Sequence, residues 1–186
     1  IIFFYCLYYF LFHSHLTPTE KEVVKRSLLG IAQVEVGVKT FWGDLYRTYP
    51  KPELNGLGAT FAECEFRHSE AYSRLLEVLG FNNQFSKLLD IPVFARKLEL
   101  IEKNLGPDVS PIWKMLFFAI VIENSSLFSQ FANILSLTRF KGHMKNVSNI
   151  IAWTSVDEQI HANAGIFLIK QLITEGHITE RMIDIL

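Results

Sequence analysis

The stretches Glu-Phe-Arg-His at residues 65–68 and Glu-Gln-Ile-His at residues 158–161 repeat one short pattern, Glu-x-x-His. A further carboxylate precedes each copy: Glu35 stands 30 residues before the first, and Glu123 stands 35 residues before the second. Residues three apart share one face of a helix, so each copy can direct a carboxylate and an imidazole at one metal ion. The sequence therefore predicts a buried site of four carboxylates and two imidazoles.

The bulk composition fits one domain that is large enough to bury a sizeable core, with 186 residues in all. The net charge is −1 and the pI is about 6.7, so we expect no nucleic-acid partner and no anionic membrane surface. The two cysteines, Cys6 and Cys64, match no zinc spacing and no disulfide framework. This usage fits a reduced, cytoplasmic setting.

The start of the chain differs from the rest, because residues 1–12 (IIFFYCLYYFLF) are almost wholly apolar. A membrane span needs roughly 20 such residues, and a secretory signal would have a basic start and a small-residue cleavage site. We expect residues 1–15 to be an aberrant segment, either a gene-model artefact or the remnant of a truncated upstream helix. A signal anchor is the alternative. The folded core would then cover residues 16–186.

The apolar residues recur with a helical period, and no strand alternation stands out. A capping box, Thr17-Pro18-Thr19-Glu20, opens the first helix. We predict two shorter helices between residues 84 and 104, broken near Ile91-Pro92. We predict long helices over residues 18–48, 57–79, 111–138 and 146–174. Each of these four carries one part of the ligand set, so the predicted class is all-α, a ferritin-like long helical bundle with a di-metal carboxylate site.

Glu123 lies within an apolar stretch that runs from Trp113 to Phe131. A lone carboxylate is costly to bury unless it is paired or bound to metal. The alternatives are that Glu123 reaches the helix edge or pairs with an Arg or Lys, and that His68 is a hydrogen-bonded core histidine. Two histidines, each three residues after a Glu and on separate long helices, favour metal ligands.

The predicted ligands are oxygen and imidazole without thiolate, which suits iron or manganese. Carboxylate-bridged ions lie roughly 3.5–4 Å apart in two-metal sites. We expect redox chemistry with O₂ rather than hydrolysis, because four carboxylates can balance two ferrous ions and then stabilise the ferric pair. The ligand types suit two iron ions, two manganese ions or a mixed pair. Cys64, next to Glu65, is interpreted as a small packing residue.

From about Leu16 to Lys170 the chain resembles the small, radical-generating (beta) subunit of class I ribonucleotide reductase. Other di-metal proteins share the paired Glu-x-x-His pattern, so two further residues distinguish this family from them. Tyr72 stands four residues after His68, and Asp157 stands immediately before Glu158. The matching stretches are residues 34–38 (VEVGV), 52–54 (PEL), 65–73 (EFRHSEAYS), 123 (E), 131–132 (FA) and 153–161 (WTSVDEQIH).

The resemblance implies a role for each site residue. Tyr72 would be oxidised to a stable tyrosyl radical, with an ordinary core tyrosine as the alternative. Asp157 would hold the ring of His68, and Phe131 would help to keep the radical dry. The implied ligands are Glu35, Glu65 and His68 for one metal and Glu123, Glu158 and His161 for the other, with Glu65 and Glu158 bridging.

The sequence departs from the family's pattern at several places. Glu35 stands where many members have Asp, Leu127 where Phe is common, and Thr154 where a larger apolar residue is common. No Trp precedes Trp42, whereas the family has an electron-relay Trp upstream of the first ligand. Only 25 residues follow His161, where the family continues with further helices and a tail. We therefore expect a chain that is truncated at both ends.

The resemblance implies the function of a ribonucleoside-diphosphate reductase beta subunit. Two iron ions, or manganese, would activate O₂ and oxidise Tyr72. The large (alpha) subunit would use this radical to reduce ribonucleotides to deoxyribonucleotides. A cytoplasmic homodimer is implied as well. Two alternatives stay open: an inactive truncated remnant that at most binds metal, and another di-metal carboxylate oxidase or oxygenase.

Overall fold

A computed structural model describes residue 12, residues 15–38 and residues 40–178 of the chain. Within these ranges there are helices and no strand, so the prediction of an all-α protein is confirmed. The elements are α2 (Pro18–Val38), α3 (Thr40–Gly43), α4 (Leu45–Thr48), α5 (Pro52–Leu79), η1 (Asn82–Gln84), η2 (Ser86–Asp90), α6 (Pro92–Leu105), α7 (Pro111–Leu116), η3 (Phe117–Ser126), α8 (Leu127–Lys141) and α9 (Lys145–Thr174).

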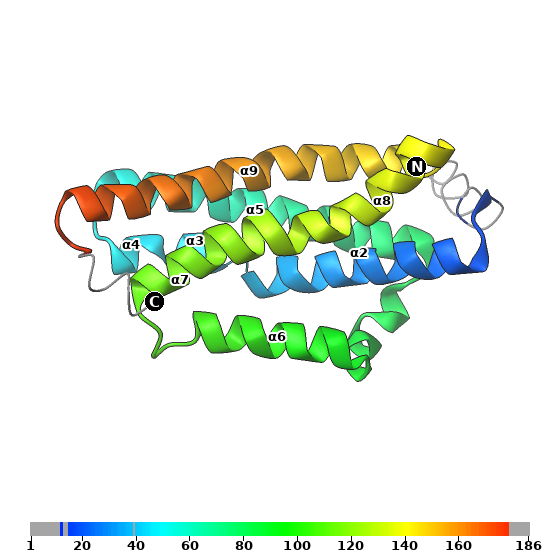
Figure 1. Cartoon of the computed structure of the whole chain (residues 1–186), viewed down its shortest axis with the longest axis horizontal. Coiled ribbons are helices and arrows are strands. Elements are labelled where there is room, and N and C mark those ends of the chain that lie inside the picture. The colour runs from blue at the N-terminus through cyan, green and yellow to red at the C-terminus, as the bar shows by residue number, and fades with distance from the viewer. Residues whose placement is uncertain (1–11, 13–14, 39, 179–186) are drawn as a thin grey trace.

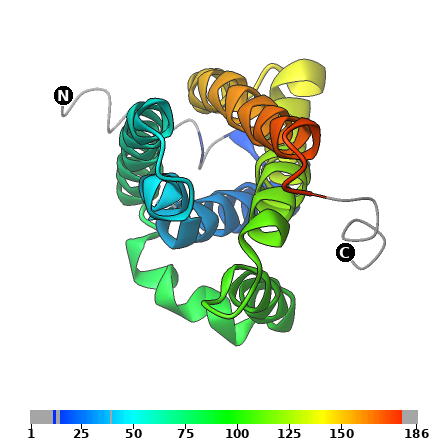
Figure 2. The same ribbon diagram turned by 90° about the vertical axis from the view of Figure 1, so that its left-hand side faces the viewer.

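Four long rods form the body of the molecule: α2, α5, the continuous run α7–η3–α8, and α9 (Figure 1). Viewed from the end, the four rods surround a common axis, and α6 lies outside them (Figure 2). The 30 residues of α9 give a rod of about 45 Å. This is the ferritin-like long bundle that the sequence predicts.

Local sequence signals set several of the helix ends. The capping box forms as predicted, because the Glu20 N–H donates to Thr17 Oγ1 over 3.3 Å and the Thr17 N–H donates to Glu20 Oε2 over 2.8 Å. Gly80 and Gly142 follow α5 and α8 with φ values of 77° and 70°. Glycine adopts this left-handed conformation without steric cost, which is why each helix ends there.

The single helix predicted over residues 18–48 is wrong. In the structure α2 ends at Val38, and the short helices α3 and α4 turn Trp42 and Leu45 into the core. The backbone oxygen of Trp42 approaches α5 so closely that a Cβ on Gly58 would lie 2.4 Å from it. Helical periodicity continues through this segment of the sequence, whereas in the structure α3 packs closely against α5.

Two further boundaries differ from the prediction. The second helix begins at Pro52 rather than at residue 57, because Pro is well tolerated in the first turn and Glu53 favours a helix N-terminus. The helix predicted over residues 111–138 extends to Lys141 and contains a π-helical segment, η3. The break near Ile91-Pro92 is confirmed, since η2 ends at Asp90 and α6 begins at Pro92.

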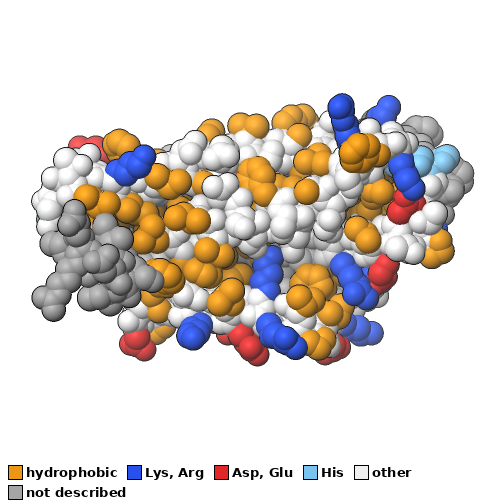
Figure 3. Space-filling model, in the orientation of Figure 1, with side chains coloured by type: hydrophobic (Ala, Val, Ile, Leu, Met, Phe, Trp, Pro, Cys, Tyr) orange, Lys and Arg blue, Asp and Glu red, His pale blue; other side chains and the backbone are white. Residues whose placement is uncertain are grey.

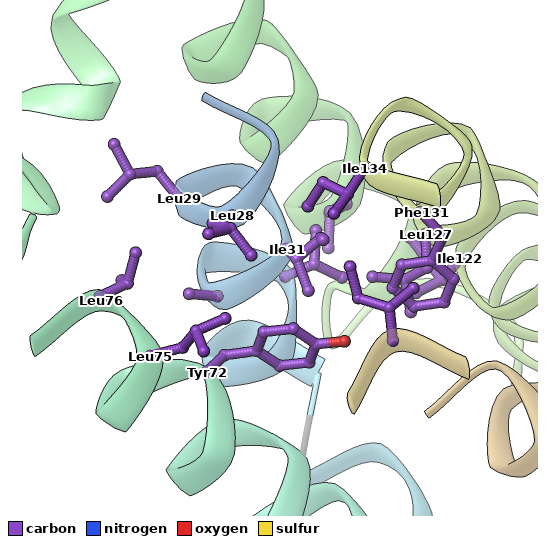
Figure 4. Close-up of a cluster of buried hydrophobic side chains, with 14 of the residues drawn as sticks. Leu28, Leu29, Ile31, Tyr72, Leu75, Leu76, Ile122, Leu127, Phe131 and Ile134 are labelled. Carbon is purple, nitrogen blue, oxygen red and sulfur yellow. The ribbon is translucent and has the colours of Figure 1, made fainter. Parts of the chain in front are cut away.

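Apolar side chains from α2, α5, η3 and α8 fill the centre of the bundle, as Figure 4 shows for Ile31, Tyr72, Ile122 and Phe131. On the face shown in Figure 3, charged side chains gather along α6 and at one end of the bundle. Among the described residues, one helical run, Pro111–Lys141, is long and apolar enough by length and composition to cross a membrane. That run is one of the four rods, and its apolar character serves the core.

The predicted aberrant segment, residues 1–15, lies mostly outside the described residues, and its interpretation stays a prediction. Within it, Phe12 is buried, and its ring meets Phe81 edge-on at a centroid distance of 5.4 Å. The side chain of Leu16, where the predicted core begins, is buried as well.

Candidate metal centre

The six predicted ligands come from all four rods and meet inside the bundle. α2 supplies Glu35, α5 supplies Glu65 and His68, η3 supplies Glu123, and α9 supplies Glu158 and His161. All six side chains are buried, and the most exposed of them, His68, has 6% of its surface accessible. Charged groups are almost never buried to this extent unless they are paired or bind metal.

The ligand atoms form two overlapping groups. In each group the candidate atoms all lie within 4.8 Å of one another. The first group consists of Glu35, Glu65, His68 and Glu158, and the second consists of Glu65, Glu123, Glu158 and His161. Glu65 and Glu158 belong to both groups, so the arrangement can hold two ions with these carboxylates between them.

Glu35 and Glu123 each belong to one group only, and we call them the outer ligands. The outer ligand Glu123 lies in the π-helical segment, Phe117–Ser126. A π-helix closes its hydrogen bonds over five residues instead of four, and such segments occur frequently at functional sites. The π-helix packs chiefly against α9, where an added Cβ on Gly165 would lie 2.6 Å from the Cβ of Ala119. Close approach at this glycine brings Glu123 next to the second Glu-x-x-His copy.

Buried atoms without partners indicate that these residues fit a pair of cations. Among the described residues, no hydrogen bond reaches either oxygen of Glu35 or Glu158, Oε1 of Glu65, or Nδ1 of His68 or His161. In folded proteins the large majority of buried polar atoms are paired. Seven buried atoms in one place that could bind a metal, five carboxylate oxygens and two imidazole nitrogens, therefore require another partner. A ligand set of carboxylate oxygen and imidazole nitrogen suits iron or manganese.

The Nδ1 atoms of His68 and His161 lie close to carboxylates but are not hydrogen-bonded to them. His68 Nδ1 is 3.0 Å from Glu158 Oε1, and His161 Nδ1 is 2.9 Å from Glu65 Oε1. Neither contact has the direction that an N–H donor requires, which is why both nitrogens count as unpartnered. Short distances without alignment are what ligands show when they converge on a shared point instead of on one another.

Without cations, the carboxylates cannot all stay ionised. Burial, with Glu158 and Glu65 nearby, holds the pKa of Glu35 well above its usual range. Burial and Glu158 likewise raise the pKa of Glu123. Burial also opposes ionisation of Glu158, but the adjacent Glu123, His161 and His68 side chains outweigh it and lower the pKa of Glu158 to about 2. The metal-free site therefore holds protons that incoming cations must displace.

The pKa values of the two histidines are raised as well. Burial disfavours the charge on His68, but Cys64, Glu158 and Glu65 outweigh it and raise the pKa of His68. The same balance of burial against Cys64 and the neighbouring carboxylates raises the pKa of His161. Positive charge is thus strongly favoured at this centre, whether it comes from protons or from metal ions.

Asp157 and Cys64 contact the outer side of His68. Asp157 Oδ2 lies 3.1 Å from His68 Nε2, and Cys64 Sγ lies 3.6 Å from the same nitrogen. When Nε2 donates its proton to Asp157, Nδ1 is left to present a lone pair to the centre. The structure therefore brings Asp157 where the resemblance implies it, and Cys64 does more than fill space on the helix.

Tyr72 is fully buried on α5, one turn beyond His68. Its hydroxyl donates to Thr154 Oγ1 over 3.1 Å, and Thr154 in turn donates to the Ile150 carbonyl over 3.1 Å. Burial raises the pKa of Tyr72, so the phenol stays protonated. The ring points towards the side of the core formed by Ile122 and Phe131 (Figure 4).

Trp42 is a site residue that the sequence alone did not identify as one. Its side chain is fully buried, and its indole Nε1 donates to Glu123 Oε1 over 3.2 Å. The ring centroid lies 5.8 Å from that of His161. In the sequence, Trp42 stood out only as the first tryptophan of the chain. The usable signal was that a buried indole N–H generally requires an acceptor.

Comparison with known proteins agrees with this geometry. The family model for the ribonucleotide reductase small chain matches residues 10–186. The probable ribonucleoside-diphosphate reductase small subunit 048L of Invertebrate iridescent virus 3 is 25% identical over 183 residues, covering 88% of this chain and 48% of the viral protein. The probable small subunit 376L of Invertebrate iridescent virus 6 is 25% identical over 180 residues, covering 88% of this chain and 50% of the viral protein. The chain spans about half the length of these relatives. Because the family model matches residues 10–186, most of this chain, the chain belongs to the ribonucleotide reductase small chain family.

Proposed function

We propose that this chain is the metal-binding and radical-forming part of a ribonucleoside-diphosphate reductase beta subunit. The observation that carries the proposal is the pair of overlapping ligand groups that share Glu65 and Glu158, with buried donor atoms that lack partners among the described residues. Membership of the small chain family and the names of the two viral relatives support it.

Each ligand residue has a distinct task in this proposal. Two iron ions, or manganese in one or both positions, would supply redox chemistry with O₂ when bound. Glu65 and Glu158 would bridge the ions, because both belong to both ligand groups. His68 and Glu35 would complete one position, and His161 and Glu123 the other. Asp157 would keep the lone pair of His68 Nδ1 directed at the centre through its contact with Nε2.

Tyr72 would be the residue that is oxidised. Conversion of its phenol to a neutral radical removes one electron and the phenolic proton. Before oxidation, that proton is held in the hydrogen bond that the phenol donates to Thr154 Oγ1, and the electron would pass to the oxidised metal pair. Buried apolar side chains around the ring, Phe131 among them, exclude water that would otherwise quench the radical.

The remaining parts of the proposal concern the whole protein. A large (alpha) subunit would receive the oxidising equivalent and reduce ribonucleotides to deoxyribonucleotides. The beta subunit would act as a cytoplasmic homodimer, with residues 16–186 as its ferritin-like core. These steps need surfaces beyond the ligand cluster, and the chain covers about half of each viral relative.

Electron paramagnetic resonance tests the proposal. The purified chain is loaded anaerobically with Fe(II), exposed to O₂, and its metal content is measured on the same sample. We expect about two ions per chain and a tyrosyl signal that Tyr72→Phe abolishes. Tyr46→Phe is the matched control, because Tyr46 is 42% exposed and is not among the ligand-group residues.

Each other outcome has a definite meaning. A tyrosyl signal that persists in Tyr72→Phe would overturn the role of Tyr72. Two bound ions without any tyrosyl signal, with iron or with manganese, would point to another di-metal oxidase or oxygenase. A chain that binds no metal would be an inactive remnant.

A further inference from the structure

A cleft lies between α6 and the rod formed by η3 and α8, and none of the six ligand residues lines it. Its volume is about 350 Å³, at the lower end of the range for small-molecule sites. Most of the wall is apolar and includes Phe94, Leu100 and Val121. Its polar part consists of Lys97, Ser126, Ser129 and Gln130, without any acidic residue. The cleft therefore offers an apolar surface beside a positive charge.

Lys97 is partly buried and has no counter-ion. Among the described residues, it takes part in no ion pair and no hydrogen bond. Lys97 also borders a smaller neighbouring cleft, and no acidic residue lines that one either. Burial lowers the pKa of Lys97 to about 8, and no charged group opposes this shift. An anion bound in the cleft would stabilise the charged ammonium group.

Two further polar groups of the wall lack partners. Ser126 Oγ and Gln130 Oε1 are buried and have no hydrogen bond in the part of the chain that the structure describes. Outside the metal centre, the hydroxyl of Tyr49 is the one other buried side-chain atom of the described residues in this situation. Gln130 and Phe94 are seated against α2, because an added Cβ on Gly30 would lie 2.6 Å from Gln130 Nε2 and 2.8 Å from Phe94 Cε1.

Buried polar atoms are paired in the large majority of cases. Three unpaired polar groups around one apolar cleft therefore indicate a ligand that combines an anionic head with an apolar body. A carboxylate head accepts hydrogen bonds from an ammonium group and from a hydroxyl, and such charge-assisted bonds are the strong ones. An ammonium group has three donor hydrogens, so Lys97 can donate to a carboxylate and to Gln130 Oε1 at once.

We propose that this cleft binds an aliphatic monocarboxylate, with the carboxylate at Lys97 and Ser126 and the chain along the apolar wall of α6 and η3. A water molecule occupies about 30 Å³ of liquid, so the cleft has room for about ten non-hydrogen atoms, the size of octanoate. The site is separate from the metal centre, and the inference does not depend on the proposed function.

Isothermal titration calorimetry of the purified chain with octanoate tests the proposal. The matched ligand is 1-octanol, which has the same chain length and no charge. We expect octanoate to bind with a Kd below about 1 mM and 1-octanol to bind at least about tenfold more weakly. Lys97→Met keeps the length of the side chain and removes its charge, so it should weaken octanoate binding by at least about tenfold. Ser126→Ala removes one donor and should weaken it about three- to tenfold.

Two matched variants serve as controls. Lys103→Met removes an exposed lysine from the same helix, α6, at a position that does not line the cleft. Ser125→Ala removes an exposed serine next to Ser126 that does not line the cleft either. Both variants should bind octanoate as the wild type does. Ser126→Ala keeps the test decisive if Lys97→Met does not fold.

Three results would overturn the proposal. The first is that octanoate does not bind. The second is equal affinity for octanoate and 1-octanol, which would mean an apolar cleft that does not recognise a carboxylate. The third is wild-type affinity for octanoate in Ser126→Ala and in folded Lys97→Met, which would place octanoate elsewhere, such as on a metal ion. Metal binding and the tyrosyl signal are measured separately, so each of these results leaves the proposed function intact.

Discussion

The two halves of the candidate metal centre carry the same Glu-x-x-His pair in different surroundings. Glu65 and His68 on α5 correspond to Glu158 and His161 on α9, and both pairs lie on regular helices three residues apart. The outer ligands differ, because Glu35 lies on the α-helix α2 and Glu123 lies on the π-helical η3. The repeated sequence pattern therefore sets the spacing of the two Glu-x-x-His pairs. The packing of the helices around them sets the position of Glu35 and of Glu123.

The largest expected effect breaks the symmetry between inner and outer ligands. Glu65→Ala and Glu158→Ala should each lose both metal ions, because each residue belongs to both ligand groups. Glu35→Ala and Glu123→Ala should each retain one ion, since each belongs to one group. Equilibrium dialysis against Mn(II) measures the number of ions bound.

Glu63→Ala is the control for this series, because Glu63 is an exposed carboxylate on α5 that pairs with Arg67. It should bind as many ions as the wild type. Retention of one ion by Glu158→Ala would show that this residue does not bridge.

A second expected effect concerns pH. Folding raises the pKa of Glu35 and of Glu123 above the usual 4.5 of a glutamate, and the pKa of His68 above the usual 6.5 of a histidine. A folded state that binds more protons than the unfolded state loses stability as pH rises. The metal-free chain should therefore become less stable as pH rises above the unfolded pKa values, and throughout the range above about pH 6.5. Cations replace those protons, so the Mn(II)-loaded chain should gain stability over the same range.

Thermal melts between about pH 6 and 9 measure how the stability of the chain changes with pH, with and without Mn(II). Glu35→Gln and Glu123→Gln should each flatten the slope of the metal-free chain, because a neutral amide replaces a group with a raised pKa. Equal slopes with and without Mn(II) would contradict proton displacement at the site.

A smaller effect tests the contact that positions Trp42. Gly58→Ala should destabilise the chain by about 1–3 kcal/mol, since its Cβ would meet the Trp42 carbonyl and force the backbone to move. Gly56→Ala, also within α5, meets nothing within 4 Å and should stabilise the chain by about 0.5–1 kcal/mol. Urea unfolding of both variants gives the two free energies. Equal free energies of unfolding for the two variants would mean that α3 does not pack closely against α5 at Gly58.

The smallest effect concerns how the helices of the two halves begin. Thr17→Ala removes the cap of α2 and should cost about 1 kcal/mol in urea unfolding. Thr19→Ala is the control, because Thr19 is exposed and has no capping contact among the described residues. α9 follows Met144, which has no side-chain cap and a φ of 60°. A loss in Thr17→Ala no larger than in Thr19→Ala would show that the cap of α2 adds no stability.

Much of the fold and the inner ligands could be predicted from sequence because both depend on local spacing. The three-residue interval between Glu65 and His68 encodes a shared helix face whatever the rest of the chain does. The apolar period likewise marks the long rods, although in the sequence it runs on beyond Val38, whereas in the structure α3 (Thr40–Gly43) packs against α5. Helical periodicity cannot predict that contact, which depends on the missing Cβ of Gly58 at the point where the backbone oxygen of Trp42 approaches α5.

The features that were not predicted depend on residues far apart in the sequence. Trp42 and Glu123 are joined by a hydrogen bond across 81 positions, and Tyr72 and Thr154 across 82. The π-helix of η3 is hidden for another reason, since its first six residues are a continuous apolar run that fits an α-helix equally well. Thr154 was noted as a departure from the family's pattern, and the structure gives it a partner in the Tyr72 hydroxyl.

The most direct test of the central claim is the electron paramagnetic resonance spectrum of the chain loaded anaerobically with Mn(II). Two ions that share Glu65 and Glu158 should be magnetically coupled, and their spectrum should differ from that of isolated Mn(II). We predict a coupled spectrum that Glu158→Ala abolishes. A spectrum of isolated ions, or the absence of bound Mn(II), would contradict a carboxylate-bridged pair at this site.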